Sequence, residues 1–494
     1  MTGGPGAAVR ETHVGVVVLL GDRAYKLKKP VRTAFCDFSS AELRRAALDR
    51  ELALNRRLAP DVYLGTAEVT GAGCAEPVLV MRRMPDDRRL ATLVADGRDV
   101  TADLRRVARL LAAFHAGARR SAAIAAEGGR DALRERWRRN LDELEPFRDG
   151  PLPAAGPATV RRLAMRFLDG RGPLFARRED RVVDGHGDLI AGDVFCLDDG
   201  PRVLDCLDFD DRLRFVDGLD DAAFLAMDLE RLGAAAAAQR FLDDYAEFAG
   251  DPAPAALAHH YVAYRAGVRA KVACLRHAQN GDESAAADAR AHLELAATHL
   301  RRGAPRLALV GGLPGTGKTT VAGLLADRTG AVLLSSDRLR KERAGLDPAT
   351  PAGSDYGTGL YDPAHTADVY TELLHRAREL TGLGESVVLD ASWTDAGWRA
   401  RARAVADEAC AELVHVRCVA PPVVAAGRIR SRRRSASDAT VAVAEQMAAT
   451  ADPWPEAVEV ATDGPVEDSA AHAERAWADS VAPLRDPGGP PGRG

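Results

Sequence analysis

A glycine-rich segment at residues 312–319, GLPGTGKT, has the clearest chemical potential in the chain. It matches the pattern G-x-x-x-x-G-K-[ST] at every fixed position. Successive backbone N–H groups in such a turn surround phosphate oxygens, and the helix that follows adds the positive end of its dipole. Lys318 is expected to reach the β- and γ-phosphates of ATP, and the Thr319 hydroxyl to bind Mg²⁺. The predicted nucleotide-binding residues are Gly312, Gly315, Thr316, Gly317, Lys318, Thr319 and Thr320.

Two aspartates close apolar segments downstream of this turn. Asp390 ends VVLD and is the expected Walker-B-like ligand of Mg²⁺, with an ordinary strand-end aspartate as the alternative. Asp337 ends VLLSSD and is a candidate base or orienting group for an acceptor hydroxyl. Arg340 and Lys341 follow it, either to clamp an acceptor anion or to form a solvated helix face.

An arginine-rich run, RIRSRRR, occupies residues 428–434. Arg428 and Arg432 lie four residues apart and so share one face of a helix. We predict that they close as a catalytic lid over the transferring phosphoryl group, because arginines stabilise the charge that develops on its oxygens. The alternative is a solvated helix face. The position after the fourth expected strand favours the lid.

A second set of acidic residues lies in HGDLIAGDV (186–194) and VLDCLDFD (203–210). These segments resemble the aminoglycoside phosphotransferase and choline kinase family, whose catalytic loop is H-G-D-x-x-x-x-N followed by a strand that ends in Asp. The resemblance implies that Asp188 accepts or orients the acceptor hydroxyl and that His186 braces the loop. It also implies a metal-binding carboxylate, for which Asp208 is the first choice and Asp205 the second.

This chain departs from the family pattern at two positions of the loop. Asp193 stands where the family has its metal-binding Asn, and Ile190 stands where close relatives often have His. An aspartate is a hard oxygen ligand and still suits Mg²⁺. Its added negative charge repels ATP phosphates unless the metal offsets it, so an altered, slow or inactive site is expected here.

The upstream segment AYKLKK places Lys26 on an expected strand, as in the V-A-I-K element of kinases. Glu51, in the helical segment DRELALNRRLAP, is the expected ion-pair partner of this ATP-binding lysine. No G-x-G-x-x-G loop precedes Lys26. Taken alone, Lys26 could be an exposed edge residue and Glu51 a helix-surface acid, but their order along the chain is that of the family.

The C-terminal segment resembles the small-molecule and polynucleotide kinase branch of the P-loop fold through GGLPGTGKTT, SSDRLRKE, VVLDASW and RIRSRRRSASDA. The whole chain is similar to bacterial two-domain proteins in which an aminoglycoside phosphotransferase-like domain is fused to a P-loop, AAA-type ATP-binding domain. KLKKPV, ELALNRRLAP and YRAGVRAKVA also carry this likeness. The resemblance implies ATP and Mg²⁺ as cofactors.

The elements that must position these residues follow from hydrophobic patterning. A strand at 14–20 and AYKLKK predict a hairpin that turns at Gly21-Asp22. Helices are expected over 39–58, 101–117 and most of 219–300, and a surface loop over 146–160. Four short strands, LALVG, VLLSSD, SVVLD and LVHVRCVA, alternate with helices after residue 303 and predict a parallel sheet.

The expected fold class is therefore α/β and α+β, with two domains. Residues 1–302 form a protein-kinase-like bilobal domain, and residues 303–485 form a P-loop NTPase domain whose parallel sheet is flanked by helices. Residues 486–494, DPGGPPGRG, are expected to be a disordered tail.

Composition bounds the function. A net charge of −5 over 494 residues argues against a dedicated nucleic-acid binder, and seven scattered cysteines indicate reduced thiols in a cytoplasmic protein. The sequence contains no run of 18 apolar residues, so no membrane span is predicted.

The predicted function is an ATP-dependent kinase that transfers phosphate to the alcohol group of a small molecule. The alternatives are an ATP-binding regulatory protein with a degenerate N-terminal kinase domain, and a polynucleotide 5′-hydroxyl kinase. Oligomeric state is not indicated.

Overall fold

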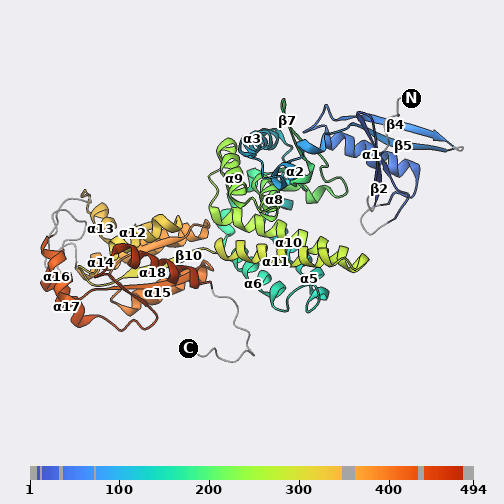
Figure 1. Cartoon of the computed structure of the whole chain (residues 1–494). Helices are drawn as coiled ribbons and strands as arrows, with labels where there is room; N and C mark the ends of the chain where they lie inside the picture. The colour runs from blue at the N-terminus through green and yellow to red at the C-terminus, as the bar shows by residue number, and fades with distance from the viewer. Residues whose placement is uncertain are drawn as a thin grey trace. The chain divides into compact units, whose positions relative to one another are not determined.

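The computed structural model describes residues 8–11, 14–32, 37–71, 74–347, 362–431 and 439–481. They form two compact units, and Figure 1 colours the chain by residue number. The first unit comprises Met1–Pro153, Ala176–Ala253 and Tyr261–Ala296, and the second comprises Ala154–Phe175, Pro254–His260 and Ala297–Gly494. The expected tail at 486–494 lies outside the described residues. No helix in the described ranges is long and apolar enough to cross a membrane.

The first unit opens with an antiparallel sheet of order β1-β2-β3-β5-β4. Its hairpin turns at Gly21 as expected, with a φ of 59°. Helix α1 (Ala41–Asn55) is capped by the Ser40 hydroxyl and packs Leu48 against Leu79. The strands are β1 (Ala8–Glu11), β2 (Gly15–Leu20), β3 (Arg23–Lys28), β4 (Tyr63–Gly71) and β5 (Cys74–Arg82).

The rest of the first unit is mostly helical, with two small antiparallel sheets that carry the acidic segments. The paired strands are β6 (Val182–Asp184) with β9 (Phe215–Asp217), and β7 (Val194–Leu197) with β8 (Gly200–Val203). The helices are α2 (Leu90–Ala95), α3 (Thr101–Gly117), α4 (Ala122–Gly128), α5 (Arg130–Leu144), α8 (Gly218–Arg231), α9 (Ala235–Ala249), α10 (Ala255–Asn280) and α11 (Glu283–Arg302). Together with the N-terminal sheet they give the bilobal, kinase-like architecture that was predicted.

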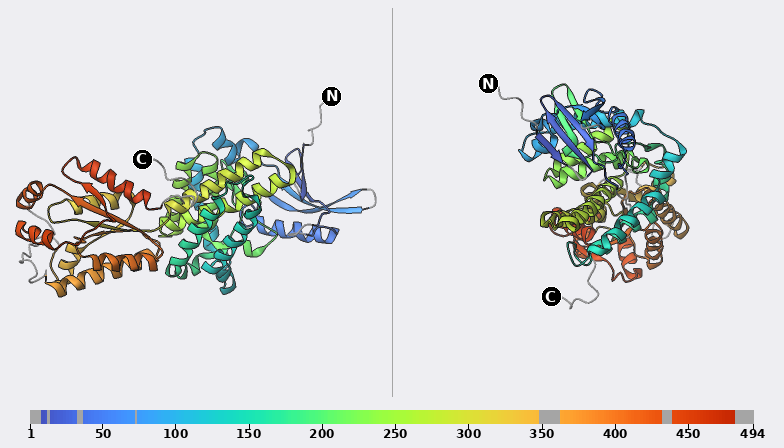
Figure 2. Two further views of the ribbon diagram at one scale, coloured as in Figure 1. Left: turned by 90° about the horizontal axis from the view of Figure 1, so that it is seen from below. Right: turned by 90° about the vertical axis from the view of Figure 1, so that its right-hand side faces the viewer.

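The second unit is built on a parallel sheet of order β11-β12-β10-β13-β14 with helices on both faces (Figure 2). This confirms the P-loop NTPase architecture. The strands are β10 (Arg306–Gly311), β11 (Val332–Ser335), β12 (Val387–Asp390), β13 (Glu412–Val419) and β14 (Val458–Ala461). The helices are α12 (Lys318–Thr329), α13 (Ser336–Arg343), α14 (Pro363–Gly382), α15 (Ala396–Glu408), α16 (Pro422–Ser431), α17 (Val441–Thr450) and α18 (Val466–Asp479). The last strand, β14, was not predicted.

The central strand β10 explains why the sheet needs helices on both sides. Ala308 and Val310 face the core formed with α12 and α18, whereas Leu307 and Leu309 face the core formed with α14 and α15. Because both faces are buried, the strand reads as a continuous apolar run rather than an alternating one.

Residues 146–160 are not entirely the loop that was expected. Helix α6 (Gly156–Gly170) begins inside this range, with Pro157 in its first turn, where proline is tolerated because the N–H has no helical partner. Helix α6 and most of α7 (Gly172–Ala176) also belong to the second unit, although the residues around them in sequence belong to the first.

A buried arginine accounts for this packing. Arg171, with no exposed surface, donates hydrogen bonds to the carbonyl oxygens of Thr381 at 2.6 Å and Ala409 at 2.8 Å. These carbonyls lie at the C-terminal ends of α14 and α15, where the helix dipole favours a cation. Burial lowers the pKa of Arg171 to about 10, so the guanidinium stays charged at neutral pH.

Replacing Arg171 with methionine is expected to destabilise the second unit by about 3 kcal/mol, because two buried carbonyls lose their donor. Urea unfolding followed by tryptophan fluorescence measures this, since four of the five tryptophans lie in that unit. Arg162→Met, at an exposed position of helix α6, which ends just before Arg171, is the matched control. Equal unfolding midpoints for the two variants would contradict the role of Arg171.

Candidate active sites

The glycine-rich turn of the second unit joins β10 to α12, as expected. Gly312, Gly315 and Gly317 all have positive φ values, at 142°, 84° and 79°. A Cβ atom on Gly315 would lie 2.5 Å from the carbonyl oxygen of Ala425, so the turn needs glycine there for space as well as for conformation. Lys318 is the first residue of α12, and the turn therefore ends at a helix N-terminus.

Asp390 is the last residue of strand β12, and it lies next to the end of β10, where this turn begins. Strand pairing sets it opposite Val310 on one side and Ser335 on the other. Its Oδ2 accepts a hydrogen bond from the Ser335 hydroxyl at 3.2 Å, whereas its buried Oδ1 has no hydrogen-bond partner among the residues that the structure describes. Burial raises the pKa of Asp390, and the charge of Lys318 and the side chain of Thr319 oppose that rise.

The unpartnered oxygen of Asp390 beside the Thr319 hydroxyl fits a hard cation such as Mg²⁺. Among the described residues, no group of three or more His, Cys, Asp or Glu side chains could hold a metal ion. A Mg²⁺ ion in this unit would therefore take further ligands from phosphate oxygens and water, as is usual for an ion bound together with a nucleotide.

Asp337 lies in the first turn of α13, not at the end of a strand as expected, because β11 stops at Ser335. Its carboxylate pairs with Arg340 at 2.7 Å. Arg340 and Lys341 are only 8% and 2% exposed, so the alternative of a solvated helix face is wrong. The structure thus brings a carboxylate and two buried cations to one short helix next to the sheet edge.

Arg428, in the last turn of α16, contacts the glycine-rich turn. Its guanidinium donates to the carbonyl oxygen of Thr462 at 2.5 Å and approaches that of Gly315 at 3.4 Å. The Thr462 hydroxyl in turn donates to the carbonyl oxygen of Thr316 at 2.7 Å. Arg428 and Thr462 therefore brace the turn. Thr462 escaped sequence analysis because it follows the unpredicted β14. Arg432 lies outside the described residues, so the lid stays a prediction.

In the first unit, Lys26 and Glu51 form the expected ion pair, with 2.6 Å between Nζ and Oε1. Glu51 is 1% exposed and also pairs with Lys28 at 2.8 Å. Lys26 further binds Asp205 at 3.0 Å. Although burial alone would lower the pKa of Lys26, the charges of Glu51 and Asp205 raise it well above its ordinary value. Lys26 and Glu51 are thus internal residues of the site, not surface residues.

Asp205, rather than Asp208, takes the position next to this lysine. The chain turns sharply at Asp205, whose φ is 61°, and its backbone N–H donates to the Tyr63 hydroxyl at 3.1 Å. Its side chain is 56% exposed, and the charge of Lys26 lowers its pKa. Asp208 instead pairs with Lys28 at 3.1 Å. The geometry thus places Asp205, the second choice from the sequence, beside Lys26, and the choice of metal-binding carboxylate between Asp205 and Asp208 stays a prediction.

The loop that carries Asp188 is held by acids of α8. Asp221 accepts hydrogen bonds from the backbone N–H groups of His186 at 2.6 Å and Gly187 at 2.9 Å. Asp228 accepts from the N–H of Ala191 at 2.8 Å. The His186 ring bonds the Leu204 carbonyl at 3.0 Å, so this histidine braces the loop as expected. These contacts fix where the Asp188 carboxylate is presented.

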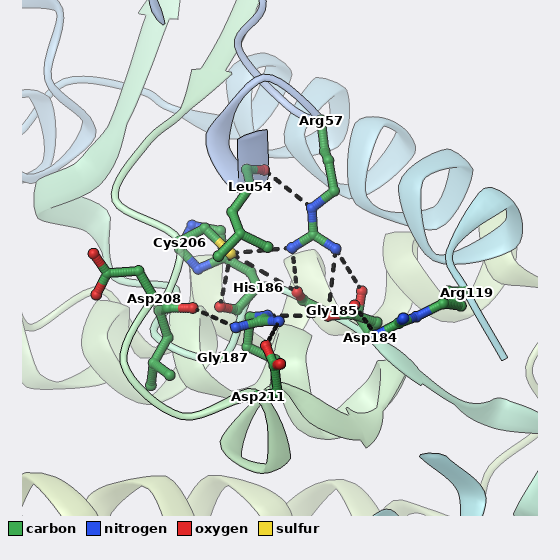
Figure 3. Close-up of polar contacts among 12 residues, drawn as sticks. Leu54, Arg57, Arg119, Asp184, Gly185, His186, Gly187, Cys206, Asp208 and Asp211 are labelled. Atoms are coloured by element: carbon green, nitrogen blue, oxygen red, sulfur yellow. Dashed lines mark hydrogen bonds and ion pairs between the residues drawn. The ribbon is translucent and has the colours of Figure 1, made fainter. Parts of the chain in front are cut away.

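Figure 3 shows a further brace that sequence analysis missed. Arg57, just after α1, donates to the carbonyl oxygens of Asp184 at 2.9 Å and Gly185 at 2.8 Å, and to Cys206 Sγ at 3.1 Å. One guanidinium thus holds the segment before His186 and the segment after Asp205 together. In the sequence, the only indication of a role for Arg57 is its position in the arginine pair of LNRRLAP.

The carboxyl groups of Asp188, Asp193 and Asp205 are close enough for their charges to interact. Burial raises the pKa of Asp188. Burial also raises the pKa of Asp193 well above its ordinary value, and the charges of Asp205 and Asp188 add to that rise. Among the described residues these side chains do not form a group that could hold a metal ion by itself, so a divalent cation here would also need oxygen ligands from a nucleotide and water.

Comparisons with known proteins agree with this two-unit geometry. A profile of the family described as an AAA domain matches residues 307–454. Uncharacterized proteins of Mycobacterium bovis and of two Mycobacterium tuberculosis strains are each 45% identical over 485 residues, which cover 97% of this chain and 97% of each relative. The similarity therefore extends over both units.

The chain is also similar to solved structures of kinases. A gluconokinase from Sinorhizobium meliloti is 18% identical and covers 36% of this chain and 95% of its own, with a TM-score of 0.28. A choline/ethanolamine kinase family protein from Mesorhizobium loti is 15% identical and covers 60% of this chain and 88% of its own, with a TM-score of 0.38.

Proposed function

As a member of the same family as these mycobacterial proteins, the chain is, we propose, an ATP-dependent small-molecule kinase. It joins a choline kinase-like unit to a P-loop unit of the AAA type. The kinase-like units make it a kinase-type ATP-binding protein. The proposal adds that the second unit transfers the γ-phosphoryl group of ATP to an alcohol with the help of Mg²⁺, and that the first unit has a second site for the same reaction.

The geometry of the second unit supports each role. The glycine-rich turn and the N-terminus of α12 offer backbone N–H groups to phosphate oxygens, and Lys318 offsets their charge. Asp390 and Thr319 would hold Mg²⁺, which when bound offsets charge on the phosphate oxygens. The acceptor oxygen forms a bond to the γ-phosphorus as the bond to the β-phosphate oxygen breaks. Asp337 takes the acceptor proton, and ADP leaves.

One observation carries the proposal. The buried Oδ1 of Asp390 has no hydrogen-bond partner among the described residues, and it lies beside a glycine-rich turn whose conformation suits phosphate binding. Calorimetry of the whole protein with Mg-ATP tests it first, and absence of binding by folded protein would refute it. Release of ADP is then measured with pooled hydroxylated metabolites. Slow hydrolysis without acceptor dependence would favour the regulatory alternative, and salt-dependent oligonucleotide binding would favour the polynucleotide kinase.

The Asp390→Asn variant should need at least about tenfold more Mg²⁺ for half-maximal ATP turnover in the second unit, because an amide offers the ion a weaker ligand. Titration of Mg²⁺ at fixed ATP measures this. Asp327→Asn, at an exposed position of α12, is the control and keeps the wild-type requirement. If the two variants share one titration curve, Asp390 does not serve the metal.

A further inference from the structure

Helix α10 of the first unit carries an unusual charge pattern. Between Ala255 and Asn280 it has no Asp or Glu. Its permanent cations are Arg265, Arg269, Lys271 and Arg276. A helix with several cations and no internal acid must find its counter-charges on other elements or on a ligand.

Three of these cations have carboxylate partners on neighbouring segments. Arg265 pairs with Asp220 at 2.7 Å, Lys271 with Glu143 at 3.2 Å, and Arg276 with Asp288 at 3.6 Å. Arg269 is half-buried and makes no hydrogen bond or ion pair with any residue in the described ranges. Its charge instead interacts, without a direct contact, with the carboxyl groups of Asp188 and Asp228.

The position of Arg269 relates it to the catalytic loop. Arg265, one helical turn earlier, reaches the carbonyl oxygen of Gly187 at 3.3 Å, directly before Asp188. Residues four apart share one helix face, so Arg269 lies on the side of α10 that faces the loop. Its charge acts on the Asp188 carboxyl and opposes the rise in pKa that burial causes.

The part of this site that is expected to bind ATP already contains a positively charged residue, Lys26. Lys26 lies with Glu51 and Asp205, where the family pattern places the ATP phosphates. In the proposed reaction Asp188 faces the acceptor hydroxyl, so a guanidinium near Asp188 is available to the acceptor. Because the guanidinium of Arg269 makes no direct contact with a carboxylate in the described ranges, its N–H groups remain available for paired N–H···O bonds to a bound anion.

We propose that the acceptor of the first unit is a small hydroxylated molecule with an anionic group, a carboxylate or a phosphate, which Arg269 binds while the hydroxyl faces Asp188. This inference rests on the proposed phosphoryl transfer by the first unit and names its substrate class. Asp188 takes the proton of the attacking hydroxyl, the bond to the γ-phosphorus forms, and ADP leaves.

The test uses the full chain with Lys318→Ala, so that the second unit is silent. Release of ADP from Mg-ATP is measured with glycerol as a neutral acceptor, ethanolamine as a cationic one, and glycerate and glycerol 3-phosphate as carboxylate and phosphate acceptors. Only the anionic probes should support turnover. Arg269→Gln should lower their kcat/KM at least tenfold, and Arg276→Gln, on the same helix, should not. Turnover with glycerol or ethanolamine that equals the anionic probes would overturn the proposal.

A binding measurement covers the case in which none of the four probes is phosphorylated. With ADP and Mg²⁺ present, calorimetry should show glycerate or glycerol 3-phosphate binding that Arg269→Gln weakens at least tenfold and Arg276→Gln leaves unchanged. Absence of any Arg269-dependent anion binding overturns the inference. A separate measurement tests the proposed function of the first unit itself. Mg-ATP binding is compared between the Lys318→Ala chain and the same chain with Lys26→Met added. Equal binding by the two would show that the first unit does not bind ATP through Lys26, whatever the result with the anions.

Discussion

The Lys318→Ala variant is expected to lose about a hundredfold or more of the ATP turnover in the second unit while its fold remains intact. Lys318 begins α12 at the end of the glycine-rich turn, and its charge reaches the buried Asp390 carboxyl. It is therefore placed to offset charge on the transferring phosphoryl group, and loss of one such fixed group costs two to three orders of magnitude in other enzymes. Alanine removes this charge without changing a core side chain.

Turnover is best measured in the whole chain with Asp188→Asn already present, so that the first unit does not contribute. Arg328→Ala, in the last turn of the same helix, is the control, because its ion pairs with Glu467 and Glu474 are exposed and contribute little. Tryptophan fluorescence verifies folding of each variant. A Lys318→Ala protein that hydrolyses ATP as fast as the control would show that the turn does not hold the reacting nucleotide.

The nucleotide-binding turn was predictable because its information is local. The strand before it, the three glycines and the helix after it are consecutive in the sequence, and the positive φ values are those that glycine favours. The same holds for the hairpin at Gly21 and for Lys26 on β3. In each case short-range stereochemistry decides the conformation, and hydrophobic periodicity identifies the elements.

The choice between Asp205 and Asp208 was not predictable from local pattern. Both lie in VLDCLDFD, and either could follow a strand. The outcome depends on contacts made far away in sequence, where the Tyr63 hydroxyl and the Asn55 amide oxygen accept from the N–H groups of Asp205 and Cys206. Such contacts select which carboxylate turns toward Lys26, and a single sequence does not reveal them.

The same limit applies to the packing of α6. Arg171 meets its carbonyl partners more than two hundred positions away, so nothing near it in sequence indicates its role. A fragment that starts at residue 303 would lack Arg171 and the segment Pro254–His260, which belong to the second unit. Activities of the two units are therefore better separated by point variants in the whole chain than by truncation.

Asp188→Asn is expected to lower acceptor-dependent turnover in the first unit by about two to four orders of magnitude, because an amide cannot take the proton of the attacking hydroxyl. The change is nearly isosteric, and the loop remains held through backbone N–H groups by Asp221 and Asp228. Affinity for ATP, which depends on Lys26 and Glu51, should therefore change little.

A fall in kcat with unchanged nucleotide affinity distinguishes this role from a structural one. The measurement uses the Lys318→Ala chain, with ADP release for kcat and calorimetry for ATP binding, and Asp199→Asn at an exposed turn as the control. Asp205→Asn should weaken Mg-ATP binding as well, whereas Asp208→Asn should affect it less, because only Asp205 pairs with Lys26. If Asp188→Asn keeps wild-type kcat, the loop is a scaffold that retains the shape of a kinase without its chemistry.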